Sequence, residues 1–128
     1  RFEEIWDIAW RSNAYIPYAD FKRNYYHSKT LESVRAYVND CDGINSVTLN
    51  KILKYLWTSL PAQPTHVVNS GKGIHFVYVL SKPVKVSGLR WSVKKLNEVI
   101  QDSFSRIVEV DRHPVVHPYR MPGFQTKI

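Results

Sequence analysis

Two aspartates separated by a single residue offer the clearest chance of chemistry in this sequence. Asp40 and Asp42 follow residues 33–38, in which apolar and polar residues alternate. Alternate residues of a strand point to the same side, so the two carboxylates would lie together and could bind one divalent cation or a pair of them. A turn is the competing interpretation, because Asp-Gly at 42–43 is a common turn signal.

A third carboxylate follows a second short alternating segment. Residues 106–110 read Arg-Ile-Val-Glu-Val and predict a strand that ends at Asp111. With Asp40 and Asp42 it could complete a site for Mg²⁺ or Mn²⁺, since hard cations prefer oxygen ligands and often hold substrate phosphates as well. A solvated strand end is the alternative interpretation of Asp111, and Glu109, on the same side of that strand, is a reserve candidate.

The segment Ser-Gly-Lys-Gly at 70–73, followed by His75, is richer in polar groups than a turn requires. Glycines allow backbone amides to approach an anion closely, and Ser70, Lys72 and His75 can donate hydrogen bonds to phosphate oxygens. The nucleotide-binding P-loop has a different spacing and leads into a helix rather than a strand. The segment therefore predicts a triphosphate cradle, with a hairpin turn and a packed histidine as the alternative.

The proline-rich tail adds cations and two further histidines. Arg120 and Lys127 flank Met-Pro-Gly-Phe-Gln-Thr and could bind phosphates through charge-assisted hydrogen bonds, although solvated surface cations are the commoner case. His113 and His117 have the spacing of a zinc-binding pair only on a helix, and the neighbouring prolines argue against a helix. We therefore do not expect zinc at these histidines.

The elements that must position these side chains follow from hydrophobic periodicity. Helical spacing of apolar residues predicts helices at 46–60, with Ser46 as N-cap, at 89–104 and, shorter and amphipathic, at 2–9. Alternation and apolar runs predict strands at 33–40, 65–69, 74–80 and 106–110, the middle two forming a hairpin. The order strand, helix, hairpin, helix, strand predicts an α+β fold with helices packed on a sheet.

Composition limits the class of protein. At 128 residues the chain is long enough for one core and too short for two ordinary domains, so we expect a single domain over 1–128. No stretch approaches the roughly 20 apolar residues of a membrane span. The single Cys41 excludes an internal disulfide and favours the cytoplasm, and a net charge of +7 favours polyanionic partners. Because the first residue is Arg1 rather than Met, we expect a fragment of a longer protein.

The motifs occur in one order: Asp-x-Asp after a strand, a helix, Ser-Gly-x-Gly-x-His between strands, a strand-end Asp, and Arg-x-Pro-Gly with Thr-Lys. This ordered set, from about Val34 to Lys127, resembles the catalytic core of the archaeo-eukaryotic primase superfamily, in particular the primase-polymerase domains of replication proteins from plasmids, phages and integrated elements. Many members have Arg-Leu-Pro-Gly-Thr followed by Asn, where this chain has Met121, Phe124 and Thr126.

The resemblance implies a fold, a set of roles and an activity. The fold would be an RRM-like sheet unit fused to a small αβ unit, with the active-site cleft between them. The catalytic Mg²⁺ or Mn²⁺ ions would be bound by Asp40, Asp42 and Asp111. The nucleotide would be contacted by Ser70, His75, Arg120 and Lys127, with Lys72 as a helper and the last two also able to face the template. The activity would be template-directed nucleotidyl transfer: primer synthesis from nucleoside triphosphates on single-stranded DNA, during replication of a mobile element, with a replicative helicase as a further partner.

Two other functions compete with primer synthesis. One is a catalytically weak or inactive primase-fold module that binds single-stranded or primed DNA through a basic and aromatic surface. The other is a nicking replication initiator with Tyr25 or Tyr26 as nucleophile. That class requires two histidines separated by one apolar residue on a strand, and the sequence contains no such triplet. Nucleotide binding that depends on a metal would distinguish the enzyme from the binding module.

Overall fold

The computed structural model describes residues 15–22, 27–58, 63–69 and 73–120, so the helix predicted at 2–9 lies outside the described residues. The element order is β1 (Tyr15–Pro17), β2 (Ala19–Phe21), the 3-10 turn η1 (Ser28–Thr30), β3 (Leu31–Asp42), α2 (Ser46–Thr58), β4 (His66–Asn69), β5 (Gly73–Lys85), α3 (Arg90–Ser105), β6 (Val110–Asp111) and β7 (Pro118–Arg120). This order confirms the predicted α+β fold class.

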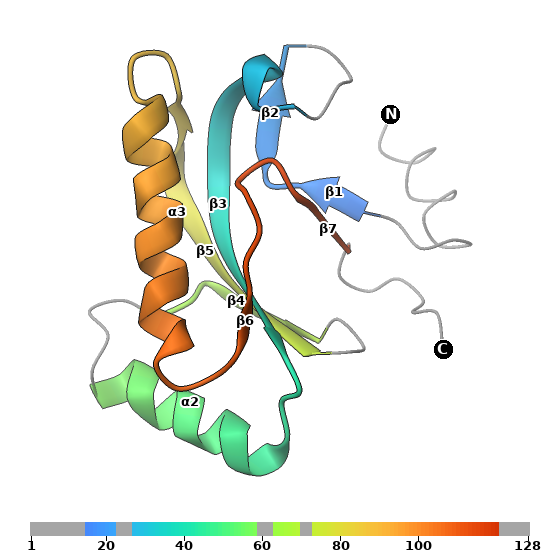
Figure 1. Ribbon diagram of the computed structural model, residues 1–128, viewed down its shortest axis with the longest axis vertical. Coiled ribbons are helices and arrows are strands. Elements are labelled where there is room, and N and C mark those ends of the chain that lie inside the picture. The colour runs from blue at the N-terminus through green and yellow to red at the C-terminus, as the bar shows by residue number, and fades with distance from the viewer. Residues whose placement is uncertain (1–14, 23–26, 59–62, 70–72, 121–128) are drawn as a thin grey trace.

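Strand β3 is an interior strand of an antiparallel sheet (Figure 1). Its strands lie in the order β2-β3-β5-β4, β6 also pairs with β3, and β1 and β7 form a separate two-stranded sheet. The pairing of β4 with β5 confirms the predicted hairpin. Strand β5 continues through Pro83 to Lys85, beyond the predicted end at residue 80. Pro83 is tolerated because the register between β3 and β5 shifts there, so the missing N–H breaks no regular ladder bond.

The two faces of β3 have different environments. On one face, Tyr37 Oη donates a hydrogen bond to the carbonyl of Val93, and Asn39 Nδ2 donates to the carbonyl of Ile100, so this face is turned toward α3. Ala36 and Val38 point the other way and pack in a cluster with β7. By the same alternation, Asp40 and Asp42 point away from the helices, whereas Cys41 between them points toward the helices.

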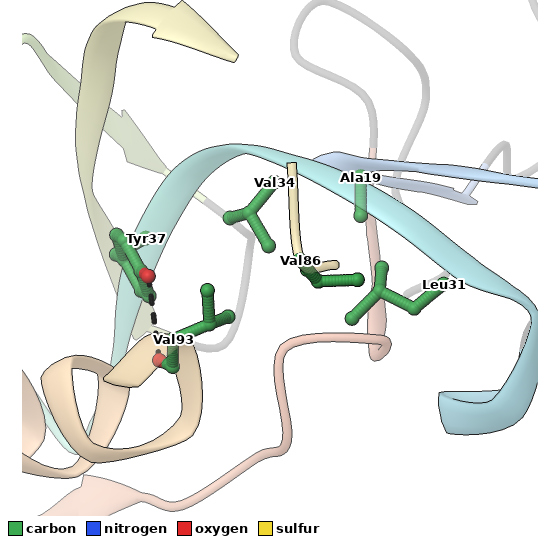
Figure 2. Packing of buried hydrophobic residues seen from close by; sticks show 6 residues of the cluster. All are labelled: Ala19, Leu31, Val34, Tyr37, Val86 and Val93. Carbon is green, nitrogen blue, oxygen red and sulfur yellow. Dashed lines mark hydrogen bonds between the residues drawn. The ribbon is translucent and has the colours of Figure 1, made fainter. Parts of the chain in front are cut away.

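Buried side chains on the helix side of the sheet hold α2 and α3 in place. Figure 2 shows one cluster, in which β2, β3, the end of β5 and α3 meet: Ala19, Leu31, Val34, Tyr37, Val86 and Val93. A second cluster joins both helices to the sheet: Cys41, Ile52, Leu56, Phe76 and Phe104. Burying an aliphatic side chain contributes about 1.5–3 kcal/mol, so these contacts are the main source of helix docking.

Both long helices occur where periodicity predicts them, with one correction. Asn45 Oδ1 accepts a hydrogen bond of 2.9 Å from the backbone N–H of Thr48, so Asn45, rather than the predicted Ser46, provides the side-chain cap of α2. In the predicted apolar stripe, Ile52 and Leu56 are buried, whereas Leu53 is 39% exposed. No helix in the described parts of the chain is long and apolar enough to cross a bilayer.

Candidate functional site

Strand register places Asp111, Asp40 and His75 in one row across the sheet. Asp40 in β3 is the cross-strand partner of His75 in β5 and also of Asp111 in β6. Directly opposite residues of antiparallel strands point to the same face, with Cβ atoms about 4.5–5.5 Å apart. Three motifs that are far apart in the sequence therefore meet on the face opposite the helices.

His75 is buried beside Asp40 rather than open to solvent. Its Nε2 lies 3.2 Å from Asp40 Oδ1, and only 9% of its side chain is exposed. The ring packs edge-on against Tyr119, with ring centroids 5.3 Å apart. A direct contact with a triphosphate, which the resemblance implies, would require the ring to leave Asp40. In the structure, His75 instead fixes the orientation of that carboxylate.

A second histidine completes the cluster, and sequence reasoning missed its role. His113 Nε2 lies 3.0 Å from Asp40 Oδ2 and 3.2 Å from Asp111 Oδ2. The prediction considered His113 only together with His117, and these two rings stack in parallel, 3.7 Å apart, instead of converging on one point. The sequence contained a signal for this role, because one residue separates Asp111 from His113, just as one residue separates Asp40 from Asp42.

The electrostatics of the cluster favour an ionised Asp40. Burial opposes ionisation of this carboxyl, but the interactions with His75 and His113 together outweigh burial and lower its pKa. Burial also lowers the pKa of His117, and the neighbouring charge of His113 adds to that shift. The cluster is thus a partly buried carboxylate held between two imidazoles.

Asp42 lies on the same face of β3 but stands apart from the converging groups. Asp40, Asp111 and His113 each present one potential ligand atom, and these atoms lie within 4.8 Å of one another; among the described residues Asp42 is not part of this group. Desolvation, followed by the negative charges of Asp40, Asp111 and Glu109, raises the pKa of the Asp42 carboxyl. The structure therefore joins two of the three predicted carboxylates and leaves the third within their electrostatic reach.

The predicted phosphate cradle is described only at its end. Ser70, Lys72 and Lys127 lie outside the described residues, and of Arg120 the backbone is described, as the β7 partner of Tyr15. At Gly73 the structure gives a reason for glycine other than the close approach of a phosphate. A Cβ there would lie 2.1 Å from the carbonyl oxygen of Cys41, so β3 and β5 approach too closely for any side chain.

The strand predicted at 106–110 is much shorter in the structure. Only Val110 and Asp111 form β6, and the residues before them pack as a turn against the second core cluster. The chain then runs as a loop alongside α3 to β7, within the tail that was predicted to be loop (Figure 1). This loop carries His113, whose backbone carbonyl accepts hydrogen bonds from Asn97 Nδ2 and Gln101 Nε2 of α3, at 3.0 and 2.9 Å.

A groove of about 950 Å³ adjoins the cluster between η1, α3 and the loop after β6. Leu31, Val86 and Val93 belong to its apolar lining, Lys29 and Lys94 add positive charge, and His113 lines both the groove and the cluster. This combination suits an anionic ligand that also has apolar surface.

Asp40 of β3, Asp111 of β6 and His113 of the following loop bring two carboxylates and one imidazole together. This set of donor atoms fits a divalent cation. The surrounding histidines already satisfy both oxygens of Asp40, so the same atoms also form a complete hydrogen-bonded group without an ion. Comparison with family models, with curated proteins and with solved structures found no match to this chain.

Proposed function

We propose that the chain is a primase-polymerase domain that carries out template-directed nucleotidyl transfer during DNA replication of a mobile element. The observation that carries the proposal is the cross-strand row: Asp40 and Asp111, which the ordered motifs assign to metal binding, are direct neighbours in the sheet. His75, from the glycine-containing motif, is the neighbour on the other side.

The finer fold is part of the same proposal. The sheet β2-β3-β5-β4, with α2 and α3 on one face, would be the RRM-like unit. The segments that lie on the opposite face, including β1 and β7, would contribute to the smaller αβ unit. The cleft between the two units would then open onto the face that carries Asp40.

Asp40 and Asp111, with Asp42 beside them, would hold Mg²⁺ or Mn²⁺. When bound, such an ion would lower the pKa of the attacking 3′-hydroxyl and neutralise charge on the leaving pyrophosphate. The residues of the chain do the positioning. His75 keeps one oxygen of Asp40 in place, and the exposed Asp111 leaves the site open to substrate on one side.

The proposed substrates are nucleoside triphosphates and a single-stranded DNA template. The net charge of +7 supports a polyanionic ligand, and the cationic groove beside the cluster offers a path for one. A replicative helicase is the proposed partner, and the cytoplasm the proposed location.

Primer synthesis on a single-stranded template, with nucleoside triphosphates and Mg²⁺ or Mn²⁺, tests this function. Asp40→Asn and Asp42→Asn should each reduce synthesis by about 100-fold or more, because the chemistry depends on positioned charge. Glu32→Gln is the matched control: it removes an exposed carboxylate from the same strand and should leave the rate unchanged. Wild-type rates in both aspartate variants, with folding verified by circular dichroism, would refute the proposal.

A DNA-binding module without catalysis is the second candidate. Two observations favour it: both oxygens of Asp40 are already satisfied by histidines, and the groove has positive charge beside apolar surface. Calorimetric titration of a nucleoside triphosphate with and without Mn²⁺ separates the two candidates. Binding that requires the metal supports the enzyme, whereas DNA binding without metal-dependent nucleotide binding supports the module.

A further inference from the structure

His113 occupies an unusual position between the two carboxylates of the cluster. Its Nε2 is close to both, 3.0 Å from Asp40 Oδ2 and 3.2 Å from Asp111 Oδ2. His75 contacts the other oxygen of Asp40, on the side away from Asp111. The space shared by Asp40 and Asp111 is therefore bordered by the imidazole of His113 and not by that of His75.

The spacing of these atoms matches adjacent corners of a metal coordination shell. In an octahedral complex with metal–ligand bonds of about 2.1 Å, neighbouring ligand atoms are about 3.0 Å apart. The two measured separations from His113 Nε2 are 3.0 and 3.2 Å, and the ligand atoms of all three residues lie within 4.8 Å of one another. A cation could thus be admitted if it displaces the hydrogen that Nε2 shares with the carboxylates and the ligand atoms move closer together.

The position of His113 is fixed by contacts to its backbone and by contacts to its ring. Its backbone carbonyl accepts hydrogen bonds from the amides of Asn97 and Gln101, two buried side chains of α3. Its ring stacks on His117 at 3.7 Å and contacts the edge of Tyr119. A side chain restricted in this way loses little conformational entropy when it binds a metal.

We infer that His113, together with Asp40 and Asp111, forms the inner ligand set of a divalent metal site that prefers a first-row transition ion such as Mn²⁺ to Mg²⁺. This inference rests on the site of the proposed function and specifies its metal. An imidazole nitrogen favours transition ions, whereas Mg²⁺ favours oxygen ligands and retains several waters. Asp42 lies outside this converging group. The remaining coordination positions are left for water or phosphate oxygens.

Pulsed electron paramagnetic resonance of Mn²⁺ added to the chain tests the ligand directly, without any assay of activity. The wild-type chain should show ¹⁴N modulation from a coordinated imidazole, and labelling with ¹⁵N-histidine should replace it. The modulation should disappear in His113→Ala and in His113→Gln, which retains a polar side chain if the alanine variant folds poorly. His66→Ala, a change at an exposed histidine of β4, is the matched control and should retain it.

Competition titrations of Mn²⁺ against Mg²⁺ give the second readout. The wild-type chain should bind Mn²⁺ at least about tenfold more tightly than Mg²⁺, and His113→Ala should reduce that ratio to about threefold or less. Glu32→Gln, which removes an exposed carboxylate of β3 outside the cluster, should leave the ratio unchanged. Absence of ¹⁴N modulation in the wild-type chain, its persistence in both His113 variants, or an unchanged ratio would overturn the inference.

These outcomes are separable from those of the proposed function. A Mn²⁺ site without nitrogen coordination would overturn the role of His113 while primer synthesis could still be observed. Nitrogen coordination in a chain that synthesises no primers would support the metal site and refute the polymerase.

Discussion

Replacing Gly73 with alanine should disrupt the sheet at the strand end that carries the acidic row. A Cβ at Gly73 would lie 2.1 Å from the carbonyl oxygen of Cys41 and 3.0 Å from the Cα of Asp42. Because ordinary contacts between such atoms are about 3.5 Å, the two strands would have to separate by about 1.4 Å. Both neighbours are backbone atoms, so no side-chain rotation can relieve the clash.

The expected cost follows from this separation. Overpacking alone costs about 1–3 kcal/mol, and each weakened ladder hydrogen bond adds about 1 kcal/mol. We therefore expect Gly73→Ala to destabilise the chain by about 3–5 kcal/mol, which corresponds to a fall in Tm of roughly 10–20 °C for a domain of this size. The Asp40–His75 pair lies two residues along each strand, so the site should be distorted as well.

Thermal and urea unfolding followed by circular dichroism measures the effect, with Gly88→Ala as the matched control. Gly88 has a φ of +74° and nothing within 4 Å of an added Cβ, so alanine there incurs only the left-handed backbone penalty of about 1–2 kcal/mol. The difference between the two variants isolates the close approach of the strands. If Gly73→Ala proves no less stable than Gly88→Ala, the steric reasoning is wrong.

Two further predictions concern groups outside the metal site. Burial, together with the charges of Asp40 and Asp42, raises the pKa of the Cys41 thiol to about 12, so its alkylation by iodoacetamide at pH 8 should be about a thousandfold slower in the native chain than in urea; similar rates would contradict its burial. Hydrogen bonds from Arg35 and Ser33 lower the pKa of Asp20. The stability that this contributes is present above the unfolded pKa, near 4, and is lost as pH falls through the folded value. Asp20→Asn should therefore weaken the pH dependence of urea unfolding below about pH 4. At pH 7 the substitution should cost no more than about 1 kcal/mol, as expected for an exposed ion pair. If the pH dependence below pH 4 is unchanged in the variant, the lowered pKa of Asp20 does not contribute to acid unfolding as argued.

Periodicity predicted the long elements of this fold and the short strand β4, but it did not predict the three-residue strands β1, β2 and β7. The helix predicted at 89–104 is Arg90–Ser105 in the structure, because an amphipathic stripe over four turns is a strong local signal. The β1–β7 pair could not be predicted in this way. It joins Tyr15–Pro17 to Pro118–Arg120, three residues a side with prolines in both strands, and its pairing is set by tertiary packing.

The candidate site shows the same division between local and long-range information. Alternation predicted that Asp40 and Asp42 share one face of the strand, since side-chain direction in a strand depends only on parity. Which residue faces Asp40 across the sheet depends on strand register, which no local pattern in β6 specifies. His113 depends still more on long-range contacts, because its position is set by amides from α3. Sequence reasoning could therefore name the carboxylates but not the imidazole between them.

The position of Asp111 and His113 depends on α3 more than on the sheet. Strand β6 has only two residues, and two ladder positions cannot by themselves hold one carboxylate beside another against their repulsion. The segment is held instead by contacts on either side of it. Before it, Ile107 and Val108 pack against the core cluster of Phe104, and after it Arg112 forms an ion pair of 2.6 Å with Asp102 of α3. Because Asn97 and Gln101 of the same helix hold the next residue, the docking of α3 on the sheet supplies the free energy that keeps the charged groups together.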